Sequence, residues 1–336
     1  MTRYAGIATG LFLAACTLHP VRPSFEGEPG DRVDLREEVL KPESAEPVWR
    51  DLTRHTDLQH PYEAIQPAPS RDGRFLAYVT NEFGPRRQIA LKDTEGAAPL
   101  QMTPGRGESL FPRISPDGRL LAYCSDREGN WDIFVARTDA PLAVTQVTFD
   151  PSDDIAPSWS PDGKRLAYCS REGEGPWRIV LVDVGTRIKT YLGPGLYPDW
   201  SPDPQDPWIC FQSLPRTPGG RSSIWIVRPD GTGLRRLVSD RSGRWSAVHP
   251  RFSPNGRWIV YATLRRSPES LLLGAPEPGD DVWIIRLDGT RDMRLTEDLT
   301  PEGWPSWGGN RIFFVSCREG GRNIYSVQPK PLEEEP

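Results

Sequence analysis

The sequence is poor in the side chains that build metal and redox sites. Its four histidines are spread over 336 residues, and neither an H-E-x-x-H motif nor a pair of C-x-x-C motifs occurs. No G-x-S-x-G nucleophile motif is present either. We therefore expect no metal ion, no other cofactor and no catalytic residue.

Positive charge is not in excess. The 41 lysines and arginines are outnumbered by 46 aspartates and glutamates, which gives a formal net charge of −5. Nucleic-acid binding depends on a basic surface that neutralises phosphates. The charge balance therefore argues against a nucleic-acid partner.

Apolar runs long enough to span a membrane are also lacking. Residues 1–15 combine a short positive start, a brief apolar stretch and small residues before Cys16, which is typical of a signal peptide. The L-A-A-C sequence ending at Cys16 resembles the bacterial lipoprotein box, in which the cysteine carries the lipid. We expect lipidation of Cys16 and membrane attachment through this anchor only. The alternative is an ordinary export signal with a chance cysteine.

Two further segments lack the apolar periodicity of folded structure. Residues 16–47 are rich in Pro, Glu and Arg, and we interpret them as a disordered tether between lipid and folded domain. A short helix over residues 34–40 is the alternative. Residues 329–336 form an acidic tail, so the folded domain is expected within residues 48–328.

A repeated motif dominates the rest of the chain. The copy F-P-R-I-S-P-D-G-R-L-L-A-Y-C-S begins at Phe111, and related copies begin at Pro67, Pro157, Pro198, Pro250 and Pro305. The copies are 45, 45, 43, 50 and 53 residues apart when aligned on one aromatic position, occupied by Tyr78, Tyr123, Tyr168, Phe211, Tyr261 and Phe314. A period of this size indicates stacked units that bury their faces against one another.

Each repeat predicts four short strands. The first strand ends in Ser, and a P-D-G or P-N-G turn leads to an apolar second strand. A polar loop then leads to a third strand, and a D-G-type turn leads to a fourth. Four-stranded repeats at this spacing are typical of propeller blades. We predict an all-β fold, a six-bladed β-propeller of four-stranded antiparallel blades.

The consensus S-P-D-G-(K/R)-x-(I/L)-A-(F/Y)-x-S resembles the TolB-type propeller repeat over residues 48–328. The resemblance implies the fold and a binding or scaffolding role. Known TolB proteins carry a separate α/β domain before the propeller, for which residues 16–47 are too short. TolB's role in the Tol–Pal system is therefore not carried over with the fold, and a Tol–Pal-like role stays open.

The ends of the domain predict how the ring closes. Residues 48–53 resemble the fourth strands of the repeats, yet they precede the first repeat. The last repeat meets Pro329 and Pro331 without a fourth strand of its own. We predict that the N-terminal strand completes the last blade, because closure removes an open sheet edge.

Large and small apolar residues recur at fixed repeat positions. Five tryptophans are predicted to pack between neighbouring blades: Trp159, Trp200 and Trp307 in first strands, Trp225 and Trp283 in third strands. Cys124 and Cys169 occupy equivalent points on adjacent blades, about 10 Å apart. That separation is too large for a disulfide, so both are predicted to be buried hydrophobes.

Several acidic residues resemble site residues, but turns explain them better. Residues 126–132 alternate like a calcium loop but have Trp131 where that loop needs glycine. The Asp of each P-D-G is expected to bond its own turn: Asp72, Asp117 and Asp162. We interpret Asp150, Asp153 and Asp154 as solvated surface, with cation binding as the alternative.

Binding is expected on the face opposite the P-D-G turns, where the variable loops lie. These loops are residues 149–156, 214–223, 239–249 and 263–281. Because Trp and Arg are common at interface hot spots, the candidate partner-binding residues are Arg216, Arg221, Arg244, Trp245, Arg265, Arg266, Leu271, Leu272 and Leu273. The alternative is that the longest loop is only a tolerated insertion.

These features together predict a monomeric, exported lipoprotein facing the periplasm or the cell surface. Its propeller is expected to bind an envelope protein or peptide without enzymatic activity. The alternative is a propeller enzyme, such as a lyase or hydrolase acting on acidic sugars at the channel mouth. A cluster of His, carboxylate and Arg side chains at one channel mouth would favour the enzyme.

Overall fold

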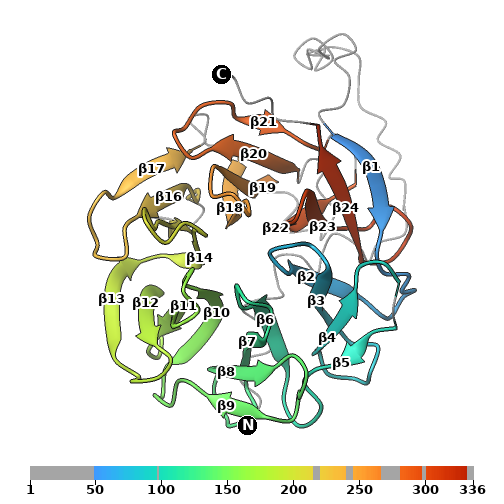
Figure 1. Cartoon of the computed structure of the whole chain (residues 1–336), viewed down its shortest axis with the longest axis horizontal. Coiled ribbons are helices and arrows are strands. Elements are labelled where there is room, and N and C mark those ends of the chain that lie inside the picture. Colours follow the sequence, from blue (N-terminus) through green and yellow to red (C-terminus); the bar gives the residue numbers. More distant parts are fainter. Residues whose placement is uncertain are drawn as a thin grey trace, which may run out of the picture.

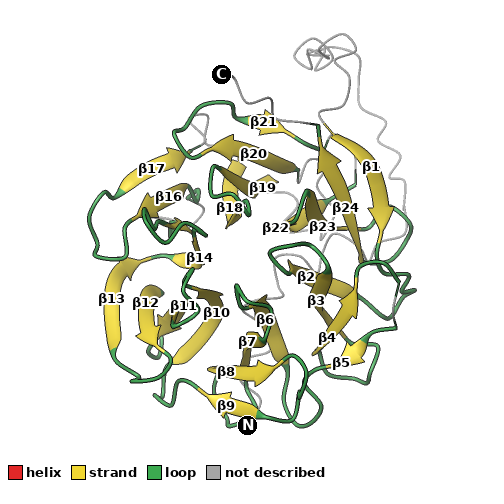
Figure 2. Ribbon diagram, in the orientation of Figure 1, coloured by secondary structure: helices red, strands yellow, loops and turns green. Residues whose placement is uncertain are grey.

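The computed structural model describes residues 49–96, 98–214, 220–239, 245–265, 281–296 and 300–330. These residues form 24 strands and no helix, so no helix among them is available to cross a membrane. The strands make six antiparallel four-stranded sheets around a central axis (Figure 1). Figure 2 shows turns and loops as the connections between strands wherever the connecting residues are described. The predicted six-bladed β-propeller is confirmed.

In the first three blades the strands follow chain order from the axis outward. Blade 1 contains β2 (Ala64–Pro69), β3 (Phe75–Thr80), β4 (Gln88–Asp93) and β5 (Leu100–Gln101). Blade 2 contains β6 (Ser109–Ile114), β7 (Leu120–Ser125), β8 (Asp132–Arg137) and β9 (Val144–Gln146). Blade 3 contains β10 (Asp153–Trp159), β11 (Arg165–Arg171), β12 (Arg178–Asp183) and β13 (Lys189–Pro194).

The remaining blades keep this order, except that the outer strand of the last one comes from the start of the chain. Blade 4 contains β14 (Leu196–Trp200), β15 (Ile209–Gln212), β16 (Ile224–Val227) and β17 (Arg235–Val238). Blade 5 contains β18 (Trp245–Phe252), β19 (Trp258–Arg265), β20 (Val282–Arg286) and β21 (Met293–Arg294). Blade 6 contains β22 (Glu302–Gly308), β23 (Arg311–Ser316), β24 (Asn323–Pro329) and β1 (Trp49–Arg54).

Strand β1 closes the ring. It pairs antiparallel with β24, with Trp49 opposite Pro329, and the two strands lie side by side in Figure 1. Arg311 of β23 adds a side-chain bond across the sheet by donating from Nη2 to Thr53 Oγ1 at 2.7 Å. The prediction that the N-terminal strand completes the last blade is confirmed.

The P-D-G turns and the equivalent R-D-G turn of blade 1 share one hydrogen-bond geometry. In blade 1, Ser70 Oγ donates to Asp72 Oδ1 at 2.6 Å, and the same carboxylate oxygen accepts the Arg74 N–H at 3.1 Å. The serine hydrogen bond holds the pKa of Asp72 below its usual value. Asp117 and Asp162 accept equivalent serine bonds at 2.6 and 2.5 Å. These aspartates are turn residues, as predicted.

Each inner strand carries a β-bulge at the same repeat position. The first bulge residue has φ between 51° and 55°, although none is glycine, and proline follows it in every blade. Proline is tolerated there because a bulge on an edge strand leaves its position outside the ladder. The six bulge residues are Gln66, Phe111, Ala156, Tyr197, His249 and Trp304.

Four of the bulge residues form an aromatic plug at the axis. The ring centroids of Phe111, Tyr197 and Trp304 lie 5.7 to 5.8 Å apart in each pair. His249 stacks on Trp304 with centroids 3.8 Å apart. These residues come from blades 2, 4, 5 and 6, and non-adjacent blades can touch only at the centre of the ring. The plug therefore fills the middle of the propeller.

The predicted core is largely confirmed. The repeated second-strand aromatics are all buried: Tyr78, Tyr123, Tyr168, Phe211, Tyr261 and Phe314. Cys124 and Cys169 are buried and free, as predicted. Of the five tryptophans, Trp159 and Trp200 are buried.

The other three tryptophans pack against the core but are less buried. Trp307, Trp225 and Trp283 are only half-buried. Trp225 and Trp283 lie in third strands, where the adjacent fourth strands β17 and β21 have only four and two residues. Short outer strands leave part of each indole uncovered.

Candidate functional site

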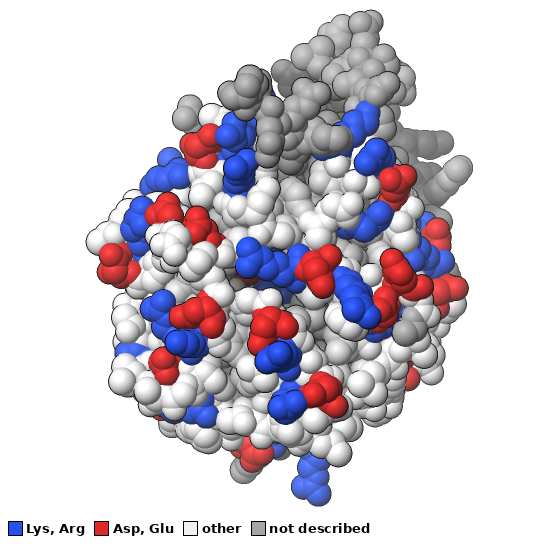
Figure 3. Space-filling model, in the orientation of Figure 1, with Lys and Arg blue, Asp and Glu red and all other residues white. Residues whose placement is uncertain are grey.

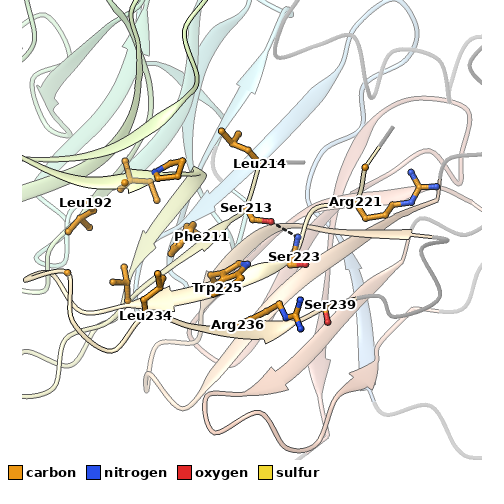
Figure 4. Close-up of a pocket in the computed structure, with 16 residues that line it drawn as sticks. Leu192, Phe211, Ser213, Leu214, Arg221, Ser223, Trp225, Leu234, Arg236 and Ser239 are labelled. Atoms are coloured by element: carbon orange, nitrogen blue, oxygen red, sulfur yellow. Dashed lines mark hydrogen bonds between the residues drawn. The ribbon is translucent and has the colours of Figure 1, made fainter. Parts of the chain in front are cut away.

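A pocket of about 820 Å³ lies between blades 3 and 4 (Figure 4). Its apolar wall combines Leu192 of β13 with Phe211, Trp225 and Leu234 of blade 4. Ligand sites in proteins typically measure roughly 300–1,000 Å³ and have mostly apolar walls. The pocket has the size and lining of a binding site.

The pocket exists because blade 4 is smaller than blade 3. Strands β15, β16 and β17 have four residues each, whereas β11, β12 and β13 have six or seven. Side chains of blade 3 therefore extend beyond the sheet that should cover them. Leu234 of blade 4, just before β17, lines the pocket and is 58% exposed.

Polar groups gather away from the apolar wall. Figure 4 shows the leucines and aromatic rings toward one end of the pocket, and Arg221 and Arg236 toward the other. The Arg236 guanidinium lies 6.0 Å from the centre of the Trp225 ring. An apolar wall with two arginines nearby suits a ligand in which an apolar side chain neighbours a carboxylate.

Three of the predicted partner-binding residues lie on neighbouring segments. Arg221 lines the pocket, and the next residue, Ser222, accepts the Ala247 N–H at 3.1 Å. That bond sets the start of β18, with Trp245, beside the β15–β16 loop. Trp245 is opposite Arg265 in the β18–β19 register. The predicted loop side of blades 4 and 5 thus brings these positions together.

The other predicted positions lie outside the residues that the structure describes. They are the lipidation site and the remaining loop candidates: Cys16, Arg216, Arg244, Arg266, Leu271, Leu272 and Leu273.

The apolar wall was not predicted from the sequence. Trp225 was predicted to pack between blades, and Leu234 and Arg236 were not among the predicted binding residues. A signal was present, because the copy starting at Pro198 has lost the P-D-G turn and its neighbouring strands are short. A degraded repeat between two regular ones indicates an incompletely covered blade face.

Buried acidic residues lie between blades 2 and 3. Burial raises the pKa of Asp132 to about 6 and that of Asp154 to about 7. Thr148 and Ser170 are near Asp154, but no hydrogen bond reaches either of its carboxylate oxygens. The expectation of solvated surface is therefore wrong for Asp154, which is completely buried.

Metal ligands are not gathered in the described part of the chain. No group of three or more His, Cys, Asp or Glu side chains there could hold a metal ion. The exposed Asp150 instead pairs with Lys189.

A second cavity, of about 130 Å³, lies on the axis beside the aromatic plug. Arg113, Asp199 and Arg251 line it, together with serines and prolines of the P-D-G turns. Burial raises the pKa of Asp199 to about 6. His249 belongs to the plug, and burial lowers its pKa to about 3. An arginine and carboxylate cluster is therefore present at this mouth.

The surface charge is mixed. In the face shown in Figure 3, blue and red side chains are interspersed around the ring, without a broad basic area. Phosphate-backbone binding requires clustered positive charge. The visible face has no such cluster.

Comparison with known proteins agrees with this architecture. Residues 54–186 match the PD40 family, described as the TolB beta propeller domain. An uncharacterised protein of Agrobacterium fabrum is 33% identical over 143 residues, which are 41% of this chain and 45% of that protein. The match therefore spans less than half the length of this relative.

Solved structures with low sequence identity share the fold. A structure from Agrobacterium tumefaciens with the provisional name TolB has a TM-score of 0.57 and 23% identity, covering 81% of this chain and 91% of that one. TolB from Acinetobacter baumannii has a TM-score of 0.56 and 20% identity, covering 78% and 65%. An oligogalacturonate lyase in complex with manganese has a TM-score of 0.55 and 17% identity, covering 83% and 93%. Residues 54–186 therefore match a TolB-type propeller family, and the solved structures share the propeller fold of the whole domain.

Proposed function

We propose that this protein is a non-enzymatic lipoprotein of the cell envelope whose propeller binds a protein or peptide partner. The observation that carries the proposal is the pocket between blades 3 and 4, with its apolar wall and its two arginines. The TolB-type fold supports a scaffolding role. The partner would be held by the rigid blades and by the loops beside them.

The chemistry of the pocket narrows the kind of partner. An apolar side chain would pack against Leu192, Phe211 and Trp225, and an adjacent carboxylate would meet Arg221 and Arg236. A segment that alternates apolar and acidic residues offers both groups. We therefore propose an acidic, apolar peptide segment of an envelope protein as the occupant.

Membrane attachment through Cys16 belongs to the same proposal. The signal-like N-terminus and the L-A-A-C sequence support it. A diacylated cysteine and a tether of residues 16–47 would keep the propeller near a membrane surface. Whether the partner belongs to a Tol–Pal-like system depends on its identity.

One observation favours an enzyme as the second candidate. Arg113, Arg251 and Asp199 surround the axial cavity, as a site for acidic sugars would require. The cavity volume of about 130 Å³, however, is well below that of typical ligand pockets, and His249 is stacked within the plug. Incubation with oligogalacturonate, followed by ultraviolet detection of unsaturated products, separates the two candidates, since only the enzyme would release them.

Site-specific crosslinking in cells tests the binding proposal. A photoreactive amino acid at Leu234, which lines the pocket, should crosslink to a discrete envelope protein. The same amino acid at Leu142, an exposed leucine of blade 2, should not. Identical crosslinking patterns from the two positions would contradict the proposed site.

A further inference from the structure

The residue after each bulge proline points to a second ligand site. These positions form a ring around the axial cavity, occupied by Ala68, Arg113, Ser158, Asp199, Arg251 and Ser306. The flanking turn is stereotyped in the repeats, but this position differs from blade to blade. Blades 2 and 5 are opposite each other in a six-bladed ring, so Arg113 and Arg251 enter the cavity from opposite sides.

The two arginines have matching and incomplete hydrogen bonding. Arg113 Nη1 donates to the Pro112 carbonyl at 2.8 Å, and Arg251 Nη1 donates to the Pro250 carbonyl at 2.9 Å. Arg251 is only 5% exposed. The Nε of Arg113 is buried without a hydrogen-bond partner. Each guanidinium is thus fixed to its own backbone, with other donors left over.

Asp199, the nearest candidate counter-ion, interacts electrostatically with Arg113 but directs its hydrogen bonds to other groups. Its Oδ1 accepts the Ser158 hydroxyl at 3.2 Å, and its Oδ2 accepts the Phe252 N–H at 2.8 Å. Within the described residues, neither Arg113 nor Arg251 forms an ion pair with any carboxylate. The buried Arg251 and the half-buried Arg113 therefore share a cavity with one carboxylate whose hydrogen bonds go to other groups.

Buried charges without a partner are costly, so they are usually paired with a counter-ion or a ligand. We propose that the axial cavity binds a small oxyanion, a carboxylate or a phosphate group, between Arg113 and Arg251. Arginine suits this role because its planar fork donates parallel bonds to carboxylate and phosphate oxygens. This site is separate from the peptide pocket and does not depend on the proposed function.

The cavity sets the size and the route of the ligand. A volume of about 130 Å³ holds a few waters at roughly 30 Å³ each, which is enough for one oxyanion group. The aromatic plug blocks one side of the cavity. Entry is from the P-D-G turn face, where Arg71 lines the rim.

The affinity of the axial cavity for an anion should depend on pH through Asp199. The groups that interact with it are Arg113, Ser158 and the buried Cys210. His249 senses the charge of Arg113 and stays neutral because its pKa is about 3. Protonation of Asp199 below about pH 6 removes the negative charge of the ring. Anion affinity should therefore rise as the pH falls through this value.

Titration calorimetry and tryptophan fluorescence test the site, because Trp159, Trp200 and Trp307 also line it. The probes are inorganic phosphate and acetate, with sulfate for the pH series. Saturable binding of the wild-type protein should weaken about tenfold or more in R113Q and in R251Q. R119Q removes an exposed charge from the same face and should bind as wild type does. D199N should bind sulfate more tightly at about pH 8 and lose the pH dependence.

Each outcome decides the proposal. Tight phosphate binding with weak acetate binding identifies a phosphoryl ligand, and comparable binding of both identifies a carboxylate. Should a Gln variant fail to fold, R113K and R251K carry the test, because lysine keeps the charge but loses the parallel bonds. The proposal is overturned if the wild type shows no saturable binding up to roughly 10 mM of any probe. It is also overturned if folded Arg variants bind as tightly as the wild type.

Discussion

His249 stacks on Trp304 at the centre of the propeller, with ring centroids 3.8 Å apart and planes 19° apart. Burial, together with the nearby charge of Arg113, lowers the pKa of this imidazole to about 3. The unfolded chain binds a proton at this position below about pH 6.5, whereas the folded chain does not. Proton uptake by the unfolded chain at this position therefore lowers the free energy of unfolding as the pH falls from about 6.5 toward about 3.

Replacing His249 by Phe should remove that loss, because phenylalanine keeps the stack and cannot be protonated. We expect H249F to match the wild type near pH 7. Near pH 4.5 it should exceed the wild type by about 2–3 kcal/mol in free energy of unfolding. Urea denaturation at both values measures the difference. A constant offset at both pH values would show that His249 titrates normally in the fold.

Asp154 has the opposite pH dependence. Its buried carboxyl has a pKa of about 7, so the folded state keeps a proton that the unfolded state releases above about pH 4. Stability is therefore lost as the pH rises from about 4 to about 7. D154N should be more stable than the wild type at about pH 8, on the order of a few kcal/mol, and similar to it at about pH 4.

Urea denaturation across this range measures the effect, with D203N as a control at an exposed aspartate. If the stability curves of D154N and the wild type run parallel, Asp154 is ionised in the folded protein.

Ring closure by β1 should be a major source of stability. A chain starting at residue 55 lacks Trp49–Arg54 and leaves β24 with an open edge. It also loses the contact of Trp49 with the core of blades 5 and 6. We expect a loss of several kcal/mol and a markedly lower Tm by calorimetry. A control chain starting at residue 47 should melt like the full domain, and equal Tm values for both chains would show that β1 is dispensable.

The lipid anchor is tested by C16S. Acyl chains supply the membrane affinity of a lipoprotein, so the variant should move from the membrane fraction to the soluble fraction. Immunoblots of fractionated cells measure the distribution. An unchanged membrane fraction would rule out Cys16 as the anchor.

Local patterns in the sequence predicted most of the fold. The Ser and Asp of each P-D-G turn form bonds within the turn, and the strand aromatics repeat at the blade spacing. Ring closure was predicted because the N-terminal segment resembles a fourth strand and the last repeat lacks a fourth strand of its own. These features depend on neighbouring residues and on periodicity, which one sequence displays fully.

The sites depend on distant residues and were predicted less well. Phe111 and His249 adopt positive φ at β-bulges of the inner strands, a conformation that no local propensity reveals. Arg113 and Asp199 are 86 residues apart in sequence and meet only through the ring geometry. The peptide pocket arises from the mismatch between blades 3 and 4, which appears only when their strand lengths are known.

The central claim, that the propeller binds an acidic, apolar peptide between blades 3 and 4, is tested most directly by peptide display. A phage library of random peptides is selected on the wild-type protein and on the variant L234E/R236E. L142E/R119E provides a control with the same substitutions at exposed positions elsewhere. The account predicts that the wild type and the control enrich peptides with an apolar residue beside Asp or Glu. The pocket variant should bind those peptides about tenfold or more weakly in solution titrations. Equal binding by the wild type and the pocket variant would contradict the account.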